Sequence, residues 1–379
     1  MNPGIIFRVL GVLLMVYSTT MLPPVVVALI YQDGGEMQFL AAFAITLISG
    51  LIAWLPVHSV KDDLRVRDGF FVVVLFWLVL GLYGAIPLVL GESPHMPITD
   101  AVFESISGLT TTGATVLTNI DALPKSVLYY RQQLQWLGGM GIIVLAVAIL
   151  PMLGIGGMQL YRAETPGPIK DNKLTPRIAE TAKALWLIYV SLTVLCAIAY
   201  WVCGMSPFDA VAHSFSTIAI GGFSTHDASI GYFNSASIEF VTIFFMFFAG
   251  INFGLHFFSL RNKTITHYFA DPEFQFYFGV LAAISVFTFS GLMLFSQYDD
   301  TFVAFRHALF QTVSIATTTG YATADFANWP PVIAIVLIMG SFIGASAGST
   351  GGGAKVIRVL LIFKQGLREM RRLIHPNAV

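Results

Sequence analysis

Residues 104–115 read Glu-Ser-Ile-Ser-Gly-Leu-Thr-Thr-Thr-Gly-Ala-Thr, a polar stretch between two long apolar spans. The stretch is too polar and too short to cross a bilayer, which takes about 20 apolar residues. Its end, Thr110-Thr111-Thr112-Gly113, recurs as Thr317-Thr318-Thr319-Gly320, and a weaker copy stands between them at Ala219-Ile220-Gly221-Gly222. We interpret all three as one device, a short helix that dips into the membrane and a Gly-containing turn that presents backbone carbonyls to an ion.

The composition indicates that lipid, not water, is the main solvent of this chain. It has 379 residues, of which 56% are hydrophobic and only 11% charged, whereas a soluble domain carries about 25% charge. The fold class is therefore an all-α polytopic membrane protein. Cys196 and Cys203 lie seven residues apart on one apolar span, roughly 10 Å along a helix, which is too far for a disulfide. We interpret them as packing residues.

The apolar spans divide the chain into four parts. Two N-terminal spans, near residues 3–31 and 37–58, come first, with a kink expected at Pro23-Pro24. Three similar cycles follow, each made of an apolar span, a polar re-entrant stretch and a second apolar span. The predicted parts are residues 1–60 for two transmembrane helices, 61–160 for a first pore repeat, 161–260 for a second, and 261–379 for a third with a basic tail. The spans that close the three cycles are predicted at 129–154, 235–260 and 331–363.

The loops alternate in charge. Lys and Arg gather in four segments, 61–67, 162–183, 261–263 and 355–372. The opposite ends of the spans carry acids, namely Asp33, Glu36, Glu92, Asp121, Asp227, Asp299, Asp300 and Asp325. By the positive-inside rule the basic loops are cytoplasmic and the re-entrant stretches open to the outside.

Alignment of Gly113, Gly222 and Gly320 tests the repeat residue by residue. Polar residues recur in one register: Asp100, Asp209 and His307 thirteen positions upstream, Glu104, His213 and Gln311 nine upstream, Ser105, Ser214 and Thr312 eight upstream, and Ser107, Ser216 and Ser314 six upstream. We expect the first set to lie near the start of each dipping helix, where a carboxylate caps free N–H groups. The unit is therefore outer helix, pore helix, filter and inner helix, repeated within one chain.

An ion site explains why such polar turns occur at membrane depth. Backbone carbonyls replace the water shell of a cation without adding a full negative charge, and glycine permits the dihedral angles that direct them. The candidate filter residues are Thr111, Thr112, Gly113, Ile220, Gly221, Gly222, Thr318, Thr319 and Gly320. The alternative, that Thr and Gly only mark tight helix packing, suits Gly138-Gly139-Met140-Gly141 and residues 250–254 better than it suits the filters.

Several other polar residues stand inside apolar sequence. We favour a structural role for Glu104 behind the filter over direct ligation. Arg131 and Arg306 lie on the outer side against the charge bias, and we expect them to pair with acids such as Asp121 or Asp300. His256 is interpreted as a packed polar residue, and Asn252 as a candidate for lining the pore.

The three filters, in order, together with Trp136-Leu137-Gly138-Gly139-Met140-Gly141, resemble the TrkH/KtrB/HKT superfamily of potassium transporters, most closely its TrkH branch. The resemblance covers essentially the whole chain, including two extra N-terminal helices. It implies a potassium-channel-like fold, potassium selectivity carried by Gly113, Gly222 and Gly320, and a bacterial cytoplasmic (inner) membrane location. It also implies K⁺ as the transported ion with no cofactor, a homodimer, and a cytosolic TrkA-type nucleotide-binding ring. Membrane lipid is a further expected partner, and nucleic acid is not.

The resemblance also implies an intramembrane gating loop in the last span. Its residues are Gly344, Ala345, Ser346, Ala347, Gly348, Ser349, Thr350, Gly351, Gly352 and Gly353. Ten small and polar residues make a poor lipid-facing helix. They suit a flexible constriction that faces a cavity, whereas the alternative is a packing hinge without a gating role.

One departure from the superfamily stands out, because this chain has three repeats where the relatives have four. A fourth filter is expected about 100 residues past Gly320, beyond Val379, so we interpret the sequence as a truncated form or fragment. The predicted function is gated potassium uptake. The alternatives are a secondary transporter coupled to protons or sodium and a truncated, non-conducting subunit. A membrane enzyme is disfavoured, because no nucleophile–base pair or metal cluster is visible in the sequence.

Overall fold

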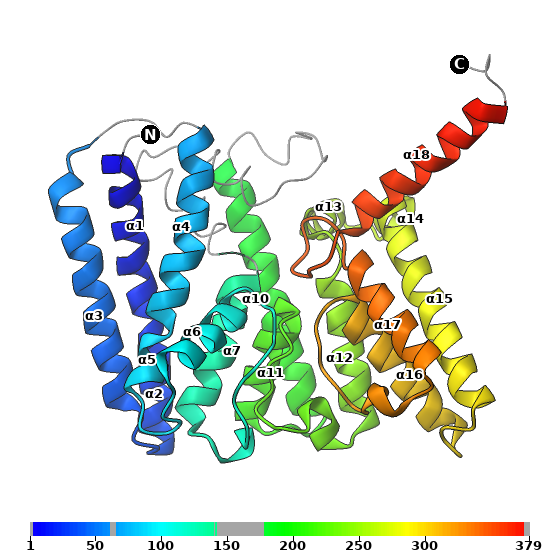
Figure 1. Cartoon of the computed structure of the whole chain (residues 1–379), viewed down its shortest axis with the longest axis horizontal. Helices are drawn as coiled ribbons and strands as arrows, with labels where there is room; N and C mark the ends of the chain where they lie inside the picture. Colours follow the sequence, from blue (N-terminus) through cyan, green and yellow to red (C-terminus); the bar gives the residue numbers. More distant parts are fainter. Residues whose placement is uncertain (1–2, 61–65, 140, 142–177, 375–379) are drawn as a thin grey trace.

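The computed structural model describes residues 3–60, 66–139, 141 and 178–374, and within these ranges the chain forms α-helices and short 3-10 helices (Figure 1). Helices long and apolar enough to cross a membrane recur along the described chain, at Pro3–Tyr31, Glu36–Val57, Lys183–Val202 and Pro272–Leu294. The prediction of an all-α membrane fold is confirmed. The basic segment 162–183 and most of the span 129–154 beyond Gly139 lie outside the described residues.

The N-terminal unit is a pair of antiparallel helical spans. It consists of α1 (Pro3–Ser18), η1 (Thr19–Met21), α2 (Leu22–Tyr31) and α3 (Glu36–Trp54). The 3-10 turn η1 ends two residues before Pro23 and Pro24, where the sequence predicts a kink. A Cβ atom on Gly11 would lie 2.8 Å from the carbonyl oxygen of Gly50, so the two spans approach closely through small residues.

The remaining helices are given by the three predicted repeats in which they fall. The first has the outer helix α4 (Val66–Gly84), then α5 (Ile86–Leu90), the pore helix α6 (Ile98–Leu109), η3 (Ile120–Ala122) and the inner helix α7 (Lys125–Gly139). The second has α10 (Ile178–Val202), the pore helix α11 (Pro207–Ala219), η5 (Ser229–Phe233), α12 (Ala236–Ala249) and α13 (Phe253–Asn262). The third has α14 (Thr266–Ala270), α15 (Pro272–Leu294), the pore helix α16 (Thr301–Ala316), η6 (Phe326–Asn328), α17 (Pro331–Ile343) and α18 (Val356–Ile374).

Two inner helices are interrupted. The span predicted at 235–260 bends by 93° between α12 and α13, because α12 ends at Ala249 and Asn252 begins a new helix by accepting a hydrogen bond from the Gly254 amide at 2.8 Å. Asn252 is therefore a helix cap. The span predicted at 331–363 is interrupted between Ile343 and Val356, where the gating loop was expected.

The starts of the pore helices agree with the prediction in two repeats of three. Asp100 and Asp209 lie in the first turns of α6 and α11. His307 does not begin α16, which starts earlier, because Asp300 accepts a hydrogen bond from the Phe302 amide at 2.7 Å and caps the helix there.

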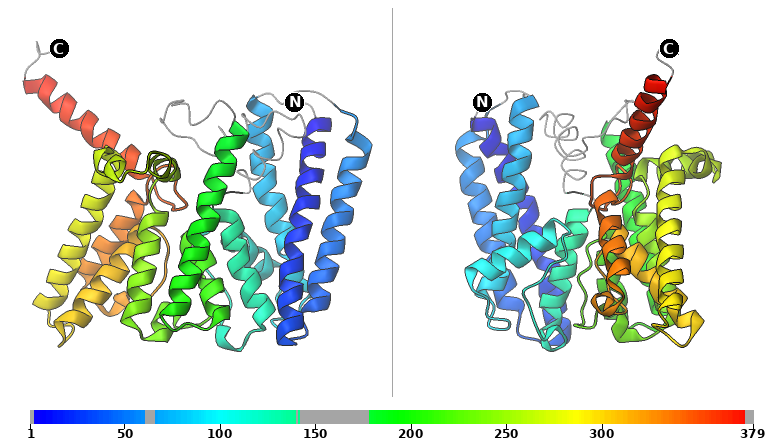
Figure 2. Two further views of the ribbon diagram at one scale, coloured as in Figure 1. Left: turned by 180° about the vertical axis from the view of Figure 1, so that it is seen from behind. Right: turned by 45° about the vertical axis from the view of Figure 1, so that its right-hand side comes forward.

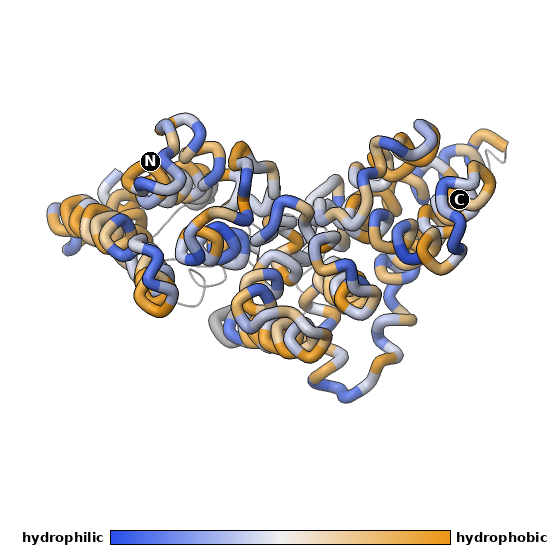
Figure 3. Tube along the Cα trace, turned by 90° about the horizontal axis from the view of Figure 1, so that it is seen from below, coloured by the Kyte–Doolittle hydropathy of each residue, from blue (hydrophilic) through white to orange (hydrophobic). Residues whose placement is uncertain are grey.

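The outer surface is suited to lipid. Large apolar side chains are exposed along α3, α15 and α17, including Ile48, Ile52, Phe278, Val286 and Phe342. Seen along the helix axes, apolar residues recur on the peripheral helices (Figure 3). The helix α18 projects beyond the other helices on the side where α1 begins (Figure 2).

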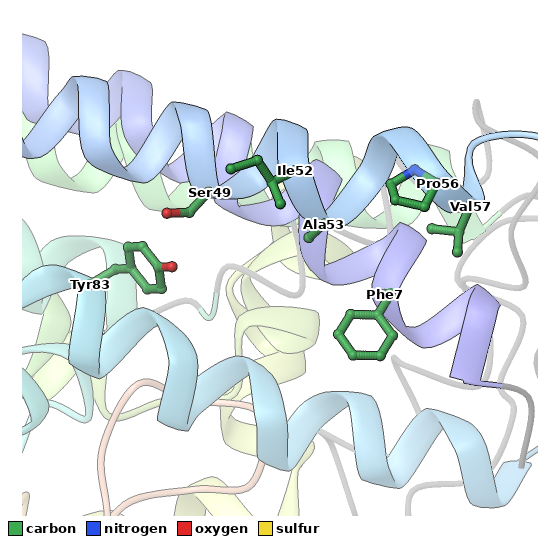
Figure 4. Close-up of a pocket in the computed structure, with 7 residues that line it drawn as sticks. All are labelled: Phe7, Ser49, Ile52, Ala53, Pro56, Val57 and Tyr83. Atoms are coloured by element: carbon green, nitrogen blue, oxygen red, sulfur yellow. The ribbon is translucent and has the colours of Figure 1, made fainter.

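An apolar hollow of about 520 Å³ lies among the first spans (Figure 4). Its lining residues are Phe7, Ser49, Ile52, Ala53, Pro56, Val57 and Tyr83. None of these is a predicted filter residue, so this hollow is separate from the candidate ion site.

Candidate ion filter

The three filters have the same backbone conformation. In each, the residue two positions before the glycine has a left-handed φ, 55° at Thr111, 55° at Ile220 and 71° at Thr318. The glycine is also left-handed, with φ of 75°, 82° and 84° at Gly113, Gly222 and Gly320. Three segments separated in sequence therefore share one unusual geometry, as their register predicts.

This geometry is suited to the predicted role of presenting backbone carbonyls to an ion. In an extended strand successive carbonyls point to opposite sides, whereas left-handed residues on either side of an ordinary one turn them toward a common side. A β-branched residue at positive φ, such as Ile220, is a steric outlier and costs about 1–3 kcal/mol. Such strain is typical of ligand clamps.

The same backbone hydrogen bond joins each of the three turns to its pore helix. The amide of the residue before the glycine donates to the carbonyl of the serine six positions upstream of the glycine. The distances are 2.9 Å from Thr112 to Ser107, 2.8 Å from Gly221 to Ser216 and 2.8 Å from Thr319 to Ser314. The end of each pore helix, with the negative end of its dipole, is therefore joined directly to a filter.

The filters also lie side by side. A Cβ atom on Gly113 would stand 2.1 Å from the Gly221 carbonyl oxygen, and one on Gly222 would stand 1.9 Å from the Thr319 carbonyl oxygen. Glycine is therefore required at both positions by close backbone approach as well as by φ. A Cβ on Gly320 would meet no described atom within 4 Å.

The residues nine positions before the glycines support the filters from behind. Glu104 accepts hydrogen bonds from the Thr115 hydroxyl at 2.9 Å and the Val116 amide at 3.2 Å. In the second repeat His213 Nε2 lies 2.9 Å from Ser224 Oγ. In the third, Gln311 donates to the Ala324 carbonyl at 2.7 Å. All three side chains are fully buried, and each binds the chain just after its filter, so the structural role favoured for Glu104 agrees with the geometry.

The predicted partners of the two outer arginines are wrong. Arg131 Nε lies 2.7 Å from Glu104 Oε1, and Arg306 Nε lies 2.9 Å from Glu239 Oε2. Both arginine side chains are withdrawn from solvent, where a guanidinium requires a carboxylate that is buried with it. Asp121 lies in the more exposed outer loop and pairs with His226, and Asp300 caps α16 as described above.

Glu104 and Arg131 are themselves part of a larger network. Arg131 also donates from Nη2 to the Thr115 hydroxyl at 3.1 Å and from Nη1 to the Ser224 carbonyl at 3.3 Å. Its guanidinium carbon stands 4.3 Å from the centre of the Phe223 ring. Arg131 therefore joins the segments that follow the first and second filters.

The loop of residues 344–353 lies against the filters on the side where the pore helices end. The Gly352 amide donates to Thr318 Oγ1 at 2.8 Å, and the Thr350 hydroxyl donates to the Ile218 carbonyl at 2.9 Å. The Ala347 amide donates to Glu273 Oε1 at 2.7 Å. The loop thus contacts the second and third repeats directly.

Sequence reasoning missed Glu273, although a signal was present. It is an acid at the beginning of a long apolar span, and its side chain is buried. An ionisable group in that setting indicates a specific partner, which here is the loop amide. Gln132 and Gln135 were missed as well, although both interrupt a predicted apolar span.

The packing interpretation is right for two inner-helix glycines. A Cβ on Gly138 would lie 1.8 Å from the Leu109 carbonyl oxygen, and one on Gly139 would lie 2.7 Å from Ala219 Cα. These glycines let α7 approach the ends of two pore helices. His256 is likewise a packed residue, with Nδ1 2.8 Å from the Tyr268 hydroxyl and Nε2 3.0 Å from the Phe248 carbonyl.

An ionic cluster stands at the outer end of the second filter. His226 Nδ1 contacts Asp121 Oδ1, and its Nε2 lies 3.6 Å from Asp209 Oδ1. The ring also stacks on Tyr232 with centroids 3.5 Å apart. Burial disfavours the charged imidazolium, but the two carboxylates outweigh burial and raise the pKa of His226 above its ordinary value.

The fold and this site define a multi-pass membrane protein with a potassium-channel-like arrangement of pore helices and filters. A family model described as TrkH, cation transport protein, matches residues 35–379, and the chain belongs to this family. It is a protein of the bacterial inner membrane.

Similar proteins span the whole chain. The chain is 57% identical over 379 residues to the Trk system potassium uptake protein TrkH of Halomonas elongata, covering 100% of this chain and 78% of the relative. It is 56% identical over 374 residues to the protein of the same name from Escherichia coli K12, covering 99% and 77%. The crystal structure of the potassium transporter TrkH from Vibrio parahaemolyticus superposes with a TM-score of 0.90 at 51% identity, covering 100% of this chain and 78% of that one. These relatives are transport proteins.

Proposed function

We propose that this protein takes up potassium ions passively through a gated, carbonyl-lined filter. The observation that carries the proposal is the side-by-side placement of three filters with the same backbone, in which a Cβ on Gly113 or Gly222 would collide with a carbonyl of the next filter. The potassium uptake named for the relatives at 56–57% identity supports the choice of ion.

The filter comprises nine residues in three segments. They are Thr111, Thr112, Gly113, Ile220, Gly221, Gly222, Thr318, Thr319 and Gly320. Their carbonyl oxygens replace the hydration shell of K⁺, and the neutral carbonyls bind it weakly enough for release. The pore repeats are residues 61–160, 161–260 and 261–379, after an N-terminal unit of residues 1–60.

The loop of residues 344–353 is proposed as the gate. Two of its contacts support this role, because Gly352 binds the Thr318 hydroxyl and Thr350 binds a carbonyl at the end of the second pore helix. A loop in this position obstructs the path below the filter until those hydrogen bonds break.

Passive conduction is favoured over coupling to protons or sodium. A coupled carrier of this kind uses acids at membrane depth that change protonation. Glu104 and Glu239 each form an ion pair with an arginine that is buried or nearly buried, so each of these carboxylates already has a fixed basic partner.

We further propose three partners. A homodimer and a cytosolic TrkA-type nucleotide-binding ring are supported by the family resemblance. Membrane lipid is supported by α18, whose basic residues, including Arg368, Arg371 and Arg372, accompany exposed Leu367, Met370 and Leu373.

The test is uptake of ⁸⁶Rb⁺ or K⁺ into proteoliposomes that contain the full chain. We expect uptake down a potassium gradient that exceeds uptake by protein-free vesicles and is unchanged by an imposed proton or sodium gradient. Uptake that scales with the proton gradient at a fixed potassium gradient would establish coupling instead. Uptake equal to that of empty vesicles would indicate a non-conducting subunit and refute the proposal.

A further inference from the structure

The inner helix α7 presents a buried polar face to a filter that belongs to the next repeat. Arg131, Gln132 and Gln135 are fully buried, and they lie within about one helical turn of each other. Their side chains contact the second pore helix, the second filter and the residues that follow it. The first repeat therefore supplies polar groups to the second filter.

The second filter lacks an interaction that the other two possess. In the first filter the hydroxyls of Thr110 and Thr112 are 2.8 Å apart, and in the third the hydroxyls of Thr317 and Thr319 are 2.7 Å apart. The equivalent residues of the second filter are Ala219 and Gly221, which have no hydroxyl group. This filter cannot brace itself in the same way.

Gln135 occupies the space that a side chain would fill there. Its Nε2 donates to the Gly221 carbonyl at 2.7 Å, and its Oε1 accepts from the Phe223 amide at 3.0 Å. A Cβ atom on Gly221 would lie only 2.4 Å from Gln135 Cδ. A side chain at position 221 would therefore displace this amide, which binds the backbone on both sides of Gly222.

The serine six positions before the filter glycine also has a different hydrogen-bond partner in the second repeat. Ser107 and Ser314 donate to the carbonyls of Ala114 and Tyr321, the residues just after the filter glycines, at 2.5 and 2.6 Å. Their counterpart Ser216 donates instead to Gln132 Oε1. In the first and third repeats this serine bonds to a carbonyl of its own repeat. In the second repeat it bonds to α7, which belongs to the first repeat.

We propose that Gln135 is a positioning residue that sets the ion specificity of the second filter, in place of the paired threonine hydroxyls of the other two. The inference rests on the proposed function of these segments as a potassium filter. The side-chain amide fixes the peptide planes before and after Gly222, and the spacing of carbonyls around a dehydrated ion decides which cation they fit.

The test compares Gln135→Met with Gln133→Met in the full chain. Gln133 is an internal control on the same helix, because it is also buried and donates to a backbone carbonyl, that of Thr20 at 2.6 Å, but in η1 of the N-terminal unit rather than on a filter. Each substitution removes a buried amide and keeps the length of the side chain. A purely structural effect would appear in both variants.

The measurement is the ratio of the apparent Kd for Na⁺ to that for K⁺, from ion-dependent thermal stabilisation of the purified protein with choline as the ionic-strength control. We expect Gln135→Met to lower this ratio about tenfold, since two backbone groups beside the ion lose their partner, and Gln133→Met to leave it unchanged. Gln135→Glu, which keeps the acceptor for Phe223 but places a carboxylate against the Gly221 carbonyl, is the second variant and should lower the ratio as well.

The outcomes distinguish the proposed potassium filter from the proposed role of Gln135. A wild-type protein that binds K⁺ selectively, with an unchanged ratio in both Gln135 variants or an equal change in Gln133→Met, would overturn the role of Gln135 alone. A wild-type protein without preference for K⁺ would overturn the filter assignment and this inference together.

Discussion

Arg131 Nε lies 2.7 Å from Glu104 Oε1, and neither side chain is exposed to solvent. The pair joins α7 to the first pore helix, and through the Ser224 carbonyl it reaches the second repeat. A buried charge whose partner is removed is costly, because it keeps its desolvation penalty and loses the attraction that offset it.

Removal of one partner should therefore destabilise the protein strongly. We expect Glu104→Gln to lower the free energy of unfolding by about 3–5 kcal/mol, measured by thermal or denaturant unfolding in detergent. The matched control is Glu369→Gln on α18, which breaks an exposed pair with Arg372 at 3.6 Å and should cost less than about 1 kcal/mol. Equal losses of unfolding free energy in the two variants would show that the buried pair contributes no more to stability than the exposed pair.

Substitution of the first filter glycine tests selectivity. A side chain at Gly113 would meet the Gly221 carbonyl at 2.1 Å, so we expect Gly113→Ser to reduce the preference for K⁺ over Na⁺ about tenfold, or about 1.4 kcal/mol. The measurement is the ratio of K⁺ to Na⁺ flux in proteoliposomes.

Gly34→Ser is the control for this substitution. Gly34 has a similar φ of 77°, with open space where a Cβ would stand, so it bears the same backbone penalty of about 1–2 kcal/mol without a close contact. We expect its selectivity to equal that of the wild type. Unchanged selectivity in Gly113→Ser would count strongly against the filter assignment.

The sequence correctly predicted contacts that are made within a single repeat. The register of Glu104, His213 and Gln311 predicts a shared position, and in the structure all three bind the chain just past a filter. This succeeded because one local solution, a pore helix followed by a turn, occurs three times at nearly constant spacing.

For contacts between side chains of one repeat and residues of another, prediction from the sequence was wrong or absent. The partner of Arg306 is Glu239 on α12, a helix of the preceding repeat. The charge pattern of the loops instead predicts Asp300, which is nearer in sequence. The role of Gln135 depends on where α7 passes the second filter, which no spacing within the first repeat encodes. The 93° bend after α12 likewise depends on a cap at Asn252 that hydropathy does not register.

The outer ionic cluster should make stability depend on pH. The pKa of His226 is raised above its ordinary 6.5, so its contribution is complete below pH 6.5 and is lost as pH rises through the higher folded value. For Asp121, burial opposes the charged form, but hydrogen bonds with His226 and the Asp227 amide lower its pKa below 3.8. Its contribution is complete above pH 3.8 and is lost as pH falls through the lower folded value.

The pair therefore stabilises most between pH 3.8 and 6.5. Between pH 6 and 9 we expect the wild type to lose stability relative to Asp121→Asn, by less than about 1 kcal/mol because the Asp121 side chain is 43% exposed and partly screened by solvent. The measurement is the unfolding midpoint of both proteins across this range. Parallel pH profiles for the two proteins would contradict the role of the pair.

The loop of residues 344–353 offers a test of gating that leaves the filter backbone intact. The Thr350 hydroxyl donates to the Ile218 carbonyl at 2.9 Å and lies 3.3 Å from the Ala249 carbonyl. Valine keeps the shape of threonine but donates no hydrogen bond, so Thr350→Val weakens the attachment of the loop to the second repeat without opening a cavity.

We expect Thr350→Val to raise K⁺ flux at a fixed gradient about fivefold, since one hydrogen bond is worth about 1 kcal/mol and its loss shifts the balance toward the open loop. The ratio of K⁺ to Na⁺ flux should stay the same, because the variant alters no filter residue. The control is Thr288→Val on α15, whose buried hydroxyl has no hydrogen-bond partner among the residues that the structure describes and whose loss should leave flux unchanged. If Thr350→Val conducts like the wild type, the loop is a packing hinge; if it changes selectivity instead of flux, Thr350 acts on the filter rather than on a gate.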